Sequence, residues 1–327
     1  MRKLNKRIMA GVLAGYGALS PVLVGAQTDP DVAALRQQLA ARGPDAAAPL
    51  VGLDANAPKP PVDADVATTA IESTLVSKGL VLLPAGGVRI TPSATWTHSG
   101  SGSDRAESTS AALSLEAGLP WGLATTLRVP YIQRDDPLGN NAGLGDLSFS
   151  LGKTLTQETA TRPSLVLRLG YQHDNGADAF AAVPIGAGFR TLTATLSAVK
   201  RVEPLALYGH LSYSHGWPTT TEIWDDAAAR AVTITPADLY GVGLGVSLAV
   251  TPEISLDSGL SFEFLGGDRF AMANGDTLRG TPSTAGYLDL GADVVLRKNL
   301  FLRLSAAAGI TEDAEDVLFS LALPYRF

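Results

Sequence analysis

The carboxy-terminal segment of the chain alternates apolar and polar positions up to its last residue. The apolar positions are Val317, Phe319, Leu321, Leu323, Tyr325 and Phe327. Successive side chains of a β-strand point to opposite faces, so this pattern predicts a strand with one face in an apolar medium and the other in a polar one. A strand that faces lipid on one side fits this pattern, and the alternative is a buried strand of a β-sandwich. We favour the lipid-facing strand because the alternation continues to the terminus.

The amino-terminal end predicts export from the cytoplasm. Four basic residues within positions 2–7 precede an apolar run over residues 8–24, and a small-residue site ends at Ala26. Residues 1–26 are therefore a predicted signal peptide, with cleavage after Ala26 and a mature chain from Gln27. The alternative, an uncleaved anchor helix, is disfavoured because the run contains glycines and a proline and is short for a bilayer span.

Composition narrows the class of protein further. No later segment is a long uninterrupted apolar run, which leaves soluble periplasmic, secreted and outer-membrane β-barrel proteins. The chain has no Cys, so disulfides cannot stabilise it. Without the signal peptide, 21 Lys and Arg remain against 32 Asp and Glu, a formal net charge of −11. This charge disfavours nucleic-acid binding.

Residues 27–64 are predicted to form a periplasmic arm. Positions 31–42 carry Val and Leu at helical spacing over about three turns, which is too short for an independent coiled coil. The stretch from residue 46 to residue 61 contains four prolines and is rich in Ala, which predicts an extended, semi-rigid linker.

Residues 65–87 contain a predicted short helix immediately before the first strand. Its apolar side includes Ile71 and Leu75, and Lys78-Gly79 ends it. A helix at this place could plug the barrel, with Ile71 and Leu75 as its contact residues. The alternative is a leader without structure.

From Val88 to Phe327 the chain repeats one pattern. Apolar residues at every second position mark about twelve segments, separated by turns rich in Gly, Ser and Asp. A closed antiparallel barrel of one chain requires an even number of strands. The predicted fold is all-β, a transmembrane antiparallel up-and-down β-barrel of about twelve strands over residues 88–327, with a short helical, proline-rich periplasmic arm.

The connectors between the predicted strands alternate between short turns and long polar loops. Only the connector over residues 156–163 is long for the short-turn side. Outer-membrane barrels keep short turns in the periplasm and longer loops outside. We therefore expect the outer membrane of a Gram-negative bacterium, with the N-terminal arm and the C-terminus in the periplasm.

Charge follows the same division between the two ends. The long loops contain Asp135-Asp136, Asp225-Asp226 and Glu312-Asp313, whereas the tight turns contain Lys200-Arg201 and Arg297-Lys298. Solvation is the simplest explanation of the acidic loops. The alternative is that they bind divalent cations that bridge to anionic outer-leaflet lipid.

The polar face of the predicted strands carries charges of both signs. By strand register, the inward-facing, pore-lining residues are Arg89, Glu116, Arg128, Asp146, Arg168, His210, Asp257, Glu263, Asp289, Asp293 and Arg303. Such residues either line a water-filled path or fill the interior with ion pairs. Because the arginines lie mainly on early strands and the carboxylates on late strands, we expect an electric field across the lumen.

The four histidines allow an enzymatic alternative. Register places His98, His173 and His215 near the outer rim and His210 inside, so a Ser/His hydrolase acting on lipid is conceivable. No local motif distinguishes a serine nucleophile, and no metal-ligand spacing is present. We therefore predict no catalytic residue, no metal site and no cofactor, and a protein that is not an enzyme.

Six short segments carry a family resemblance. They are residues 82–87 (LLPAGG), 118–123 (GLPWGL), 128–131 (RVPY), 143–147 (GLGDL), 309–317 (GITEDAEDV) and 323–327 (LPYRF). Over roughly residues 75–327 the chain resembles an outer-membrane transporter family that includes the secretion channel of the functional-amyloid (Fap) system. That family is related to barrel proteins associated with aromatic-compound (phenol meta-pathway) degradation. The resemblance implies a trimer of twelve-stranded barrels, each plugged by an N-terminal helix attached to a periplasmic coiled coil, although the arm here is shorter and rich in proline.

Together these patterns predict an outer-membrane channel or transporter that passes a solute or an exported polypeptide through a gated or plugged lumen. Two alternatives stay open: a barrel enzyme acting on lipid, and a non-conducting structural or adhesive barrel. The expected partners are outer-membrane lipid and lipopolysaccharide, the barrel-assembly machinery, an unidentified transported substrate, and further copies of the chain in a homotrimer. Nucleic acid is not expected as a partner.

Overall fold

The structure is a computed structural model that describes residues 72–225 and 228–327. The predicted signal peptide and periplasmic arm lie outside the described residues, as do Ile71 and Asp226. No helix in the described part of the chain is both long enough and apolar enough to cross a membrane.

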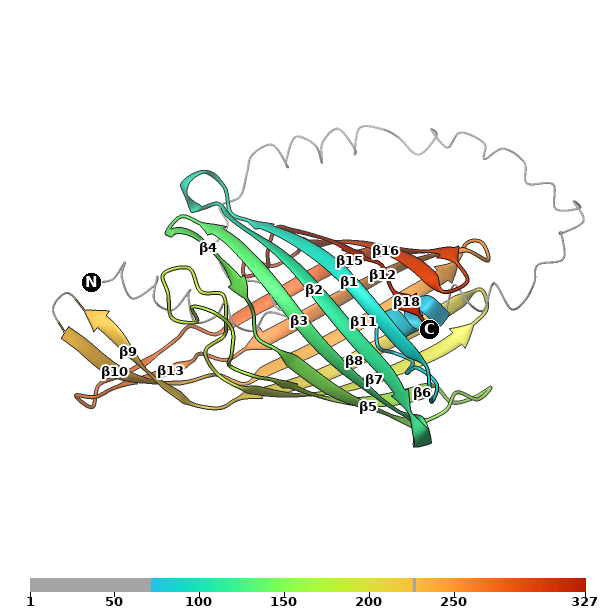
Figure 1. The fold of residues 1–327 in the computed structure, drawn as a ribbon, viewed down its shortest axis with the longest axis horizontal. Helices are drawn as coiled ribbons and strands as arrows, with labels where there is room; N and C mark the ends of the chain where they lie inside the picture. Colours follow the sequence, from blue (N-terminus) through green and yellow to red (C-terminus); the bar gives the residue numbers. More distant parts are fainter. Residues whose placement is uncertain (1–71, 226–227) are drawn as a thin grey trace, which may run out of the picture.

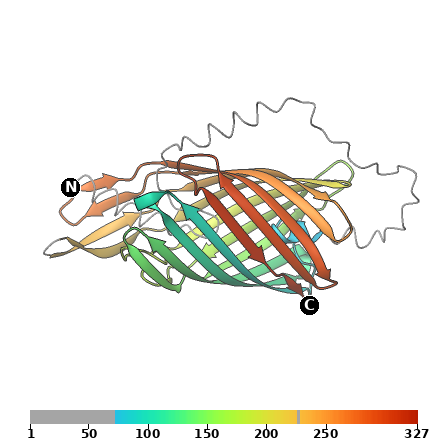
Figure 2. The ribbon, with the colours of Figure 1, turned by 90° about the horizontal axis from the view of Figure 1, so that it is seen from above.

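The described chain forms a closed antiparallel β-barrel of twelve strands, as predicted (Figure 1). The barrel strands are β1 (Val88–Ser99), β2 (Ala106–Leu119), β3 (Leu123–Asp136), β5 (Ser148–Thr156), β6 (Ser164–Gln172), β7 (Thr191–Val202), β8 (Leu205–Gly216), β11 (Leu239–Ala249), β12 (Ile254–Leu265), β15 (Ser283–Arg297), β16 (Leu300–Gly309) and β17 (Val317–Ala322), which β18 (Tyr325–Arg326) continues. β1 pairs with β2 on one side and with β17 and β18 on the other, so the sheet closes on itself. Figure 2 shows the red carboxy-terminal strands beside the blue-green first strands.

The outer surface of the barrel is apolar. Large side chains at alternate positions are exposed on it, including Leu244 with 68% of its surface exposed and Leu211 with 60%. Leu211 lies beside Leu196 of β7 and Val242 of β11, so the apolar surface continues from strand to strand. Soluble monomers rarely expose an apolar surface of this extent. The alternation predicted from the sequence therefore places a lipid-compatible face outward.

Aromatic side chains gather near both ends of this apolar surface. Near the end with long connectors, exposed aromatic residues include Tyr131, Tyr213, Tyr240, Phe264 and Phe319. Near the other end, Trp121, Tyr325 and Phe327 are exposed. Girdles of aromatic residues flank the lipid-facing band of outer-membrane barrels because these rings favour the membrane interfaces.

The connectors alternate in length around the barrel as predicted. Short turns join β2 to β3, through η3 (Pro120–Gly122), and also β7 to β8, β11 to β12 and β15 to β16. The longer connector between β5 and β6 lies at the same end, and it places Glu158 against the next turn. The Glu158 carboxylate receives a hydrogen bond of 2.7 Å from the Arg201 backbone N and lies 3.3 Å from Lys200 Nζ. The extra length of this connector thus brings the Glu158 carboxylate to the basic residues Lys200 and Arg201.

The long connectors are folded rather than merely solvated, which sequence patterns did not predict. β9 (Thr219–Asp225), β10 (Ala228–Thr235), β13 (Arg269–Met272) and β14 (Thr277–Arg279) form a second sheet that extends beyond the barrel at the end away from the C-terminus (Figure 1). Phe189, Val232, Ile234 and Phe270 form a buried cluster beneath this sheet. Buried apolar contacts therefore order this end of the molecule.

Two smaller elements complete the long-connector end. β4 (Gly139–Leu144) extends the pairing of β3, and η2 (Gly102–Asp104) lies between β1 and β2.

A buried carboxylate joins two connectors at this end. Asp268, between β12 and β13, accepts a hydrogen bond of 2.7 Å from Ala237 N. Burial raises the pKa of the Asp268 carboxyl, and this hydrogen bond opposes the shift.

Two of the acidic loop carboxylates accept hydrogen bonds from the backbone of neighbouring segments. Asp316 accepts from Gly100 N at 2.9 Å, and Asp313 accepts from Thr284 N at 2.8 Å. Across residues 72–225 and 228–327, no group of three or more His, Asp or Glu side chains is placed to hold a metal ion. These contacts give Asp313 and Asp316 a structural role in joining neighbouring loops.

Candidate functional site

The interior of the barrel is polar because the inward positions alternate with the apolar outward ones. On β12, Leu256 has 46% of its surface exposed on the outside, whereas its neighbours Ser255 and Asp257 are buried. On β15, Leu290 is 57% exposed and Asp293, three positions on, is buried. Because successive side chains of a strand point to opposite faces, the polar residues face the interior while the leucines between them face outward.

A segment that precedes β1 lies inside this polar interior. It comprises residues 72–87 and is called here the inner segment; its residues 72–77 are helical and are seen within the barrel near the C-terminal end (Figure 1). Gly79 has a φ of +71° and ends the helix, while Leu80 N donates to Leu75 O at 2.8 Å. A left-handed glycine after the last helical turn satisfies carbonyls that would otherwise be unpaired.

The inner segment contacts the wall over a wide arc that runs from β8 to β2. Leu75 is completely buried and packs with Leu80 against Val199 of β7 and Ala206 of β8. Further along, Leu82 packs against Ala124 of β3 and Val166 of β6. Gly86 N then donates to Gly118 O of β2 at 3.0 Å.

The close fit of the inner segment is also visible in the wall. A Cβ at Gly118 would overlap the carbonyl oxygens of Leu83 and Pro84, so only glycine allows this approach. A cavity of about 610 Å³ remains beside the segment at the short-turn end, lined among others by Leu82, Glu158 and Arg201. The segment therefore occupies part of the cross-section, and the cavity lies between it and the connector that contains Glu158.

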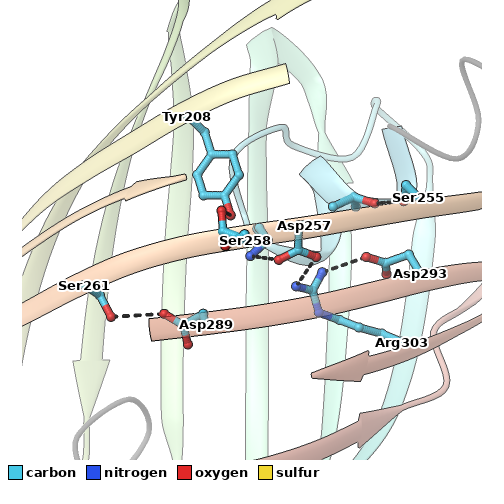
Figure 3. Close-up of polar contacts among 10 residues, drawn as sticks. Tyr208, Ser255, Asp257, Ser258, Ser261, Asp289, Asp293 and Arg303 are labelled. Atoms are coloured by element: carbon cyan, nitrogen blue, oxygen red, sulfur yellow. Dashed lines mark hydrogen bonds and ion pairs between the residues drawn. The ribbon is translucent and has the colours of Figure 1, made fainter. Parts of the chain in front are cut away.

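One side of the lumen carries a cluster of carboxylates joined by basic groups. Lys78 Nζ of the inner segment lies 2.6 Å from Asp257 Oδ2. Arg303 of β16 donates from Nη2 to Asp257 Oδ1 at 3.3 Å and from Nη1 to Asp293 Oδ2 at 3.1 Å, so that it lies between the two carboxylates (Figure 3). Ser261 Oγ donates to Asp289 Oδ2 at 3.3 Å nearby. Such pairing offsets the cost of placing these charges where water is scarce.

A second contact joins the inner helix to the same wall. Thr74 Oγ1 and Ser255 Oγ of β12 share a hydrogen bond of 2.5 Å, and both residues have no exposed surface. Together with the ion pair from Lys78, it positions the carboxy-terminal half of the helix against β12.

The other side of the lumen is rich in arginine. Arg89 of β1 pairs with Glu116 of β2 and donates to Val76 O of the inner helix at 3.1 Å. Arg168 of β6 donates to Thr126 Oγ1 at 3.3 Å and to Ser150 Oγ at 3.1 Å.

Arg128 lies on β3, beside the inward positions of β2 and β5. Its direct register neighbours are Ser114 and Ser148. With Arg89 and Arg168 it places basic groups on β1, β3 and β6, whereas the acidic cluster lies on β12 and β15. Arginines therefore predominate on one arc of the wall, with Glu116 among them, and carboxylates on the other, with Arg303 among them.

Three of the predicted pore-lining residues have distinct surroundings. Asp146 lies in the break between β4 and β5 and accepts hydrogen bonds from Gly176 N at 2.6 Å and Ala187 N at 2.7 Å, so it holds the connector between β6 and β7. His210 on β8 packs over Gly243, where a Cβ would overlap its ring. Glu263 is on β12, paired in register with Gly241 and Ala285. Asp146 thus anchors a loop, while His210 and Glu263 occupy barrel positions.

Sequence reasoning missed several residues that the structure brings into the cluster. They are Thr74 and Lys78 of the inner segment, and Tyr208 and Ser255 of the wall. Tyr208 has the same strand parity as His210, a signal that would have placed it inward. No sequence signal could pair Lys78 with Asp257, because that pairing depends on the path of the inner segment.

The rim histidines have carboxylate neighbours. His98 Nδ1 lies 3.4 Å from Glu107 Oε1, and His215 Nδ1 lies 2.7 Å from Asp238 Oδ1. His215 also stands edge-on to the ring of Trp217. These contacts join His98 to the adjacent strand β2 and His215 to the connector before β11.

Comparison with known proteins shows where this architecture occurs. The sequence matches no protein-family profile. The structure is similar to the COG4313 outer membrane channel from Pseudomonas putida F1, with a TM-score of 0.64 and 15% identity over 76% of this chain and 97% of that one. The likeness is one of fold. Weaker similarity extends to the translocator domain of the autotransporter NalP from Neisseria meningitidis (TM-score 0.42, 12% identity, 81% of this chain and 98% of that one) and to the toluene transporter TodX of Pseudomonas putida (TM-score 0.41, 8% identity, 75% and 89%).

Proposed function

We propose that this protein is an outer-membrane channel whose lumen is closed on the short-turn side by the inner segment. The observation that carries the proposal is the placement of residues 72–87 inside a polar barrel, in contact with both the acidic and the basic sides of the wall. A segment held by two ion pairs, Lys78 with Asp257 and Glu72 with Arg201, a few hydrogen bonds and apolar contacts can leave while the wall remains intact. Passage then depends on its displacement.

The surface supports the membrane location. An apolar outer face between two sets of exposed aromatic residues fits the hydrocarbon layer of a bilayer. Outer-membrane barrels have short periplasmic turns, and this supports a periplasmic location for the C-terminus and the inner segment, which lie at the short-turn end. The fold likeness to an outer-membrane channel agrees with this assignment.

A reversible cross-link tests closure by the inner segment. The chain contains no Cys, and Thr74 Oγ1 lies 2.5 Å from Ser255 Oγ, so the double variant Thr74→Cys/Ser255→Cys places two thiols at bonding distance. We expect low conductance in planar bilayers when the pair is oxidised and at least several-fold more frequent opening after reduction. The two single-Cys variants serve as controls for the substitutions and for the reductant.

A non-conducting structural barrel is the second candidate, because ion pairs occupy part of the lumen. Arg303 with its two aspartates and Arg89 with Glu116 are arrangements that fill small barrels. This candidate predicts no conductance in either redox state of the double-Cys variant, nor after deletion of residues 27–77. Equal conductance of the oxidised and reduced forms would count against closure by the inner segment.

The remaining expectations complete the proposal. We propose that lipid and lipopolysaccharide contact the apolar outer face, that the barrel-assembly machinery inserts the chain, and that three copies associate. Relation to the Fap secretion channel and to the phenol meta-pathway barrels rests on the sequence resemblance alone. Cross-linking in native membranes tests the trimer.

A further inference from the structure

The ammonium group of Lys78 occupies a defined position in the lumen. Its Nζ lies 2.6 Å from Asp257 Oδ2 and 4.9 Å from the centroid of the Tyr208 ring. The Asp257 side chain is only 2% exposed, and that of Lys78 is 19% exposed. A carboxylate and the face of an aromatic ring thus surround one cation.

The wall itself shapes this position. A Cβ at Gly245 of β11 would overlap the Tyr208 ring, and a Cβ at Gly291 of β15 would overlap the Asp257 carboxylate. Glycine at these two places lets the ring and the carboxylate lie flat against the neighbouring strands. Both glycines belong to the barrel, so the room for these groups does not depend on the inner segment.

Wall contacts also hold the two binding groups in place. Arg303 Nη2 donates to Asp257 Oδ1 at 3.3 Å, on the oxygen that Lys78 does not contact (Figure 3). Tyr208 Oη donates to the backbone oxygen of Ser258 at 3.4 Å. The site is therefore preorganised by residues that stay behind when Lys78 leaves.

The geometry points to an ammonium-binding site of the lumen, formed by Asp257 and Tyr208, which Lys78 fills while the inner segment is seated. We infer that its external ligand is the primary ammonium group of a solute, with an alkyl stem that lies along the lumen as the lysine stem does. A primary ammonium donates a charged hydrogen bond to the carboxylate and interacts with the ring face. This inference rests on the proposed closure of the channel by the inner segment.

The site couples binding to opening. A solute ammonium and Lys78 cannot occupy the same position, so binding of one disfavours the other. A ligand that binds only when Lys78 is displaced shifts the population toward the displaced state. Cationic solutes would thereby promote their own passage.

Binding of n-butylammonium, which reproduces the lysine stem and head group, tests the site. The probe is titrated calorimetrically into the full chain in non-ionic detergent. The variant Lys78→Met keeps an unbranched side chain that is one atom shorter, so it removes the charge and vacates the position of Nζ. We therefore expect at least about tenfold tighter binding than to the wild type. In the double variant Lys78→Met/Asp257→Asn this gain should be lost.

Further variants separate the parts of the site. In the Lys78→Met background, Tyr208→Phe keeps the ring and should retain binding, whereas Tyr208→Leu should weaken it several-fold. Tetramethylammonium, which has no N–H to donate, should bind more weakly than butylammonium, and n-butanol should not bind. Heat-modifiable electrophoretic mobility verifies folding, and Lys78→Gln replaces Lys78→Met if the latter does not fold.

The inference is overturned if butylammonium binds Lys78→Met no more tightly than the wild type, or if Asp257→Asn leaves the gain intact. This readout needs no conductance, so it fails independently of the proposed function. Tighter butylammonium binding together with an ineffective Thr74–Ser255 cross-link would keep the ammonium site and reject closure. An effective cross-link without the gain in butylammonium binding would support closure by the inner segment and reject the ammonium site.

Discussion

Lys78 at the end of the inner helix and Asp257 on β12 form an ion pair of 2.6 Å inside the barrel, although they are far apart in the sequence. This contact is the charged link between the inner segment and the acidic side of the wall. Because charge-assisted hydrogen bonds are among the stronger side-chain contacts, its loss should have a measurable effect on where the segment resides.

Replacing Asp257 should loosen the inner segment. A hydrogen bond to a charged group contributes about 1.5–3 kcal/mol, so Asp257→Asn should increase the opening frequency of the full-length channel by roughly tenfold or more. Single-channel recording in planar bilayers measures it. Asp276→Asn, in the exposed turn between β13 and β14, is the matched control. An equal opening frequency in both variants would contradict the role of Lys78–Asp257 as an anchor.

The two glycines of the inner segment with positive φ should resist substitution. Gly79 and Gly86 have φ values of +71° and +83°, so alanine at either costs about 1–2 kcal/mol in backbone strain. At Gly79 a Cβ would also come within 3.1 Å of Arg168 Nη2, whereas at Gly86 nothing lies within 4 Å. Gly79→Ala should therefore open the channel more often than Gly86→Ala. Similar opening of the two variants would show that the Arg168 contact is without consequence.

Arg303 should be a major contributor to barrel stability. Its side chain is 15% exposed and those of its partners Asp257 and Asp293 are 2% and 3% exposed, so Arg303→Met leaves buried carboxylates without their arginine. Breaking such a buried pair costs about 3–5 kcal/mol. Urea unfolding in lipid vesicles measures the loss. The control is Arg105→Met, in an exposed pair with Glu107, for which less than about 1 kcal/mol is expected. Comparable losses for both would mean that water reaches the Arg303 cluster freely.

Neighbouring residues of the last strands should respond oppositely to charge. Leu321 is 42% exposed on the apolar face, whereas Ser320 Oγ shares a hydrogen bond of 2.9 Å with Thr95 Oγ1 on the inward face. Lysine on the lipid face costs about 2–4 kcal/mol at the midplane and less toward the interfaces. Leu321→Lys should reduce the yield of folded, heat-modifiable barrel, and Ser320→Lys should be tolerated. The reverse order of yields would refute the assignment of the two faces.

Strand number, the two faces and the alternation of connectors could be predicted from sequence. Each depends on a local period of two or on the spacing of turn residues, and both patterns can be recognised directly in the sequence. For that reason Leu256 and Asp257 could be assigned to opposite faces before any contact was known. The same parity would have placed Tyr208 inside.

Three features depended on tertiary structure. The sheet of β9, β10, β13 and β14 lies in segments whose polar composition indicated loops, and it is ordered by contacts between distant hairpins. The length of the connector over residues 157–163 is explained only by the contact between Glu158 and the Arg201 backbone, which the sequence does not reveal. The alternation of residues assigns Asp146 to the lumen. In the structure, the connector between β6 and β7 folds back onto Asp146, and Gly176 N donates a hydrogen bond to its carboxylate.

Within the barrel strands, the sequence by itself determined which side chains face the lumen, because a strand has only two faces and the alternation assigns each residue to one. Only the tertiary structure decided which inward residues meet. Closure of the sheet sets the stagger between strands, and the path of the inner segment sets which wall each of its residues touches. Lys78 therefore reaches Asp257 and Tyr208 through a geometry that has no local signature, since it arises from contacts between parts of the chain that are distant in sequence.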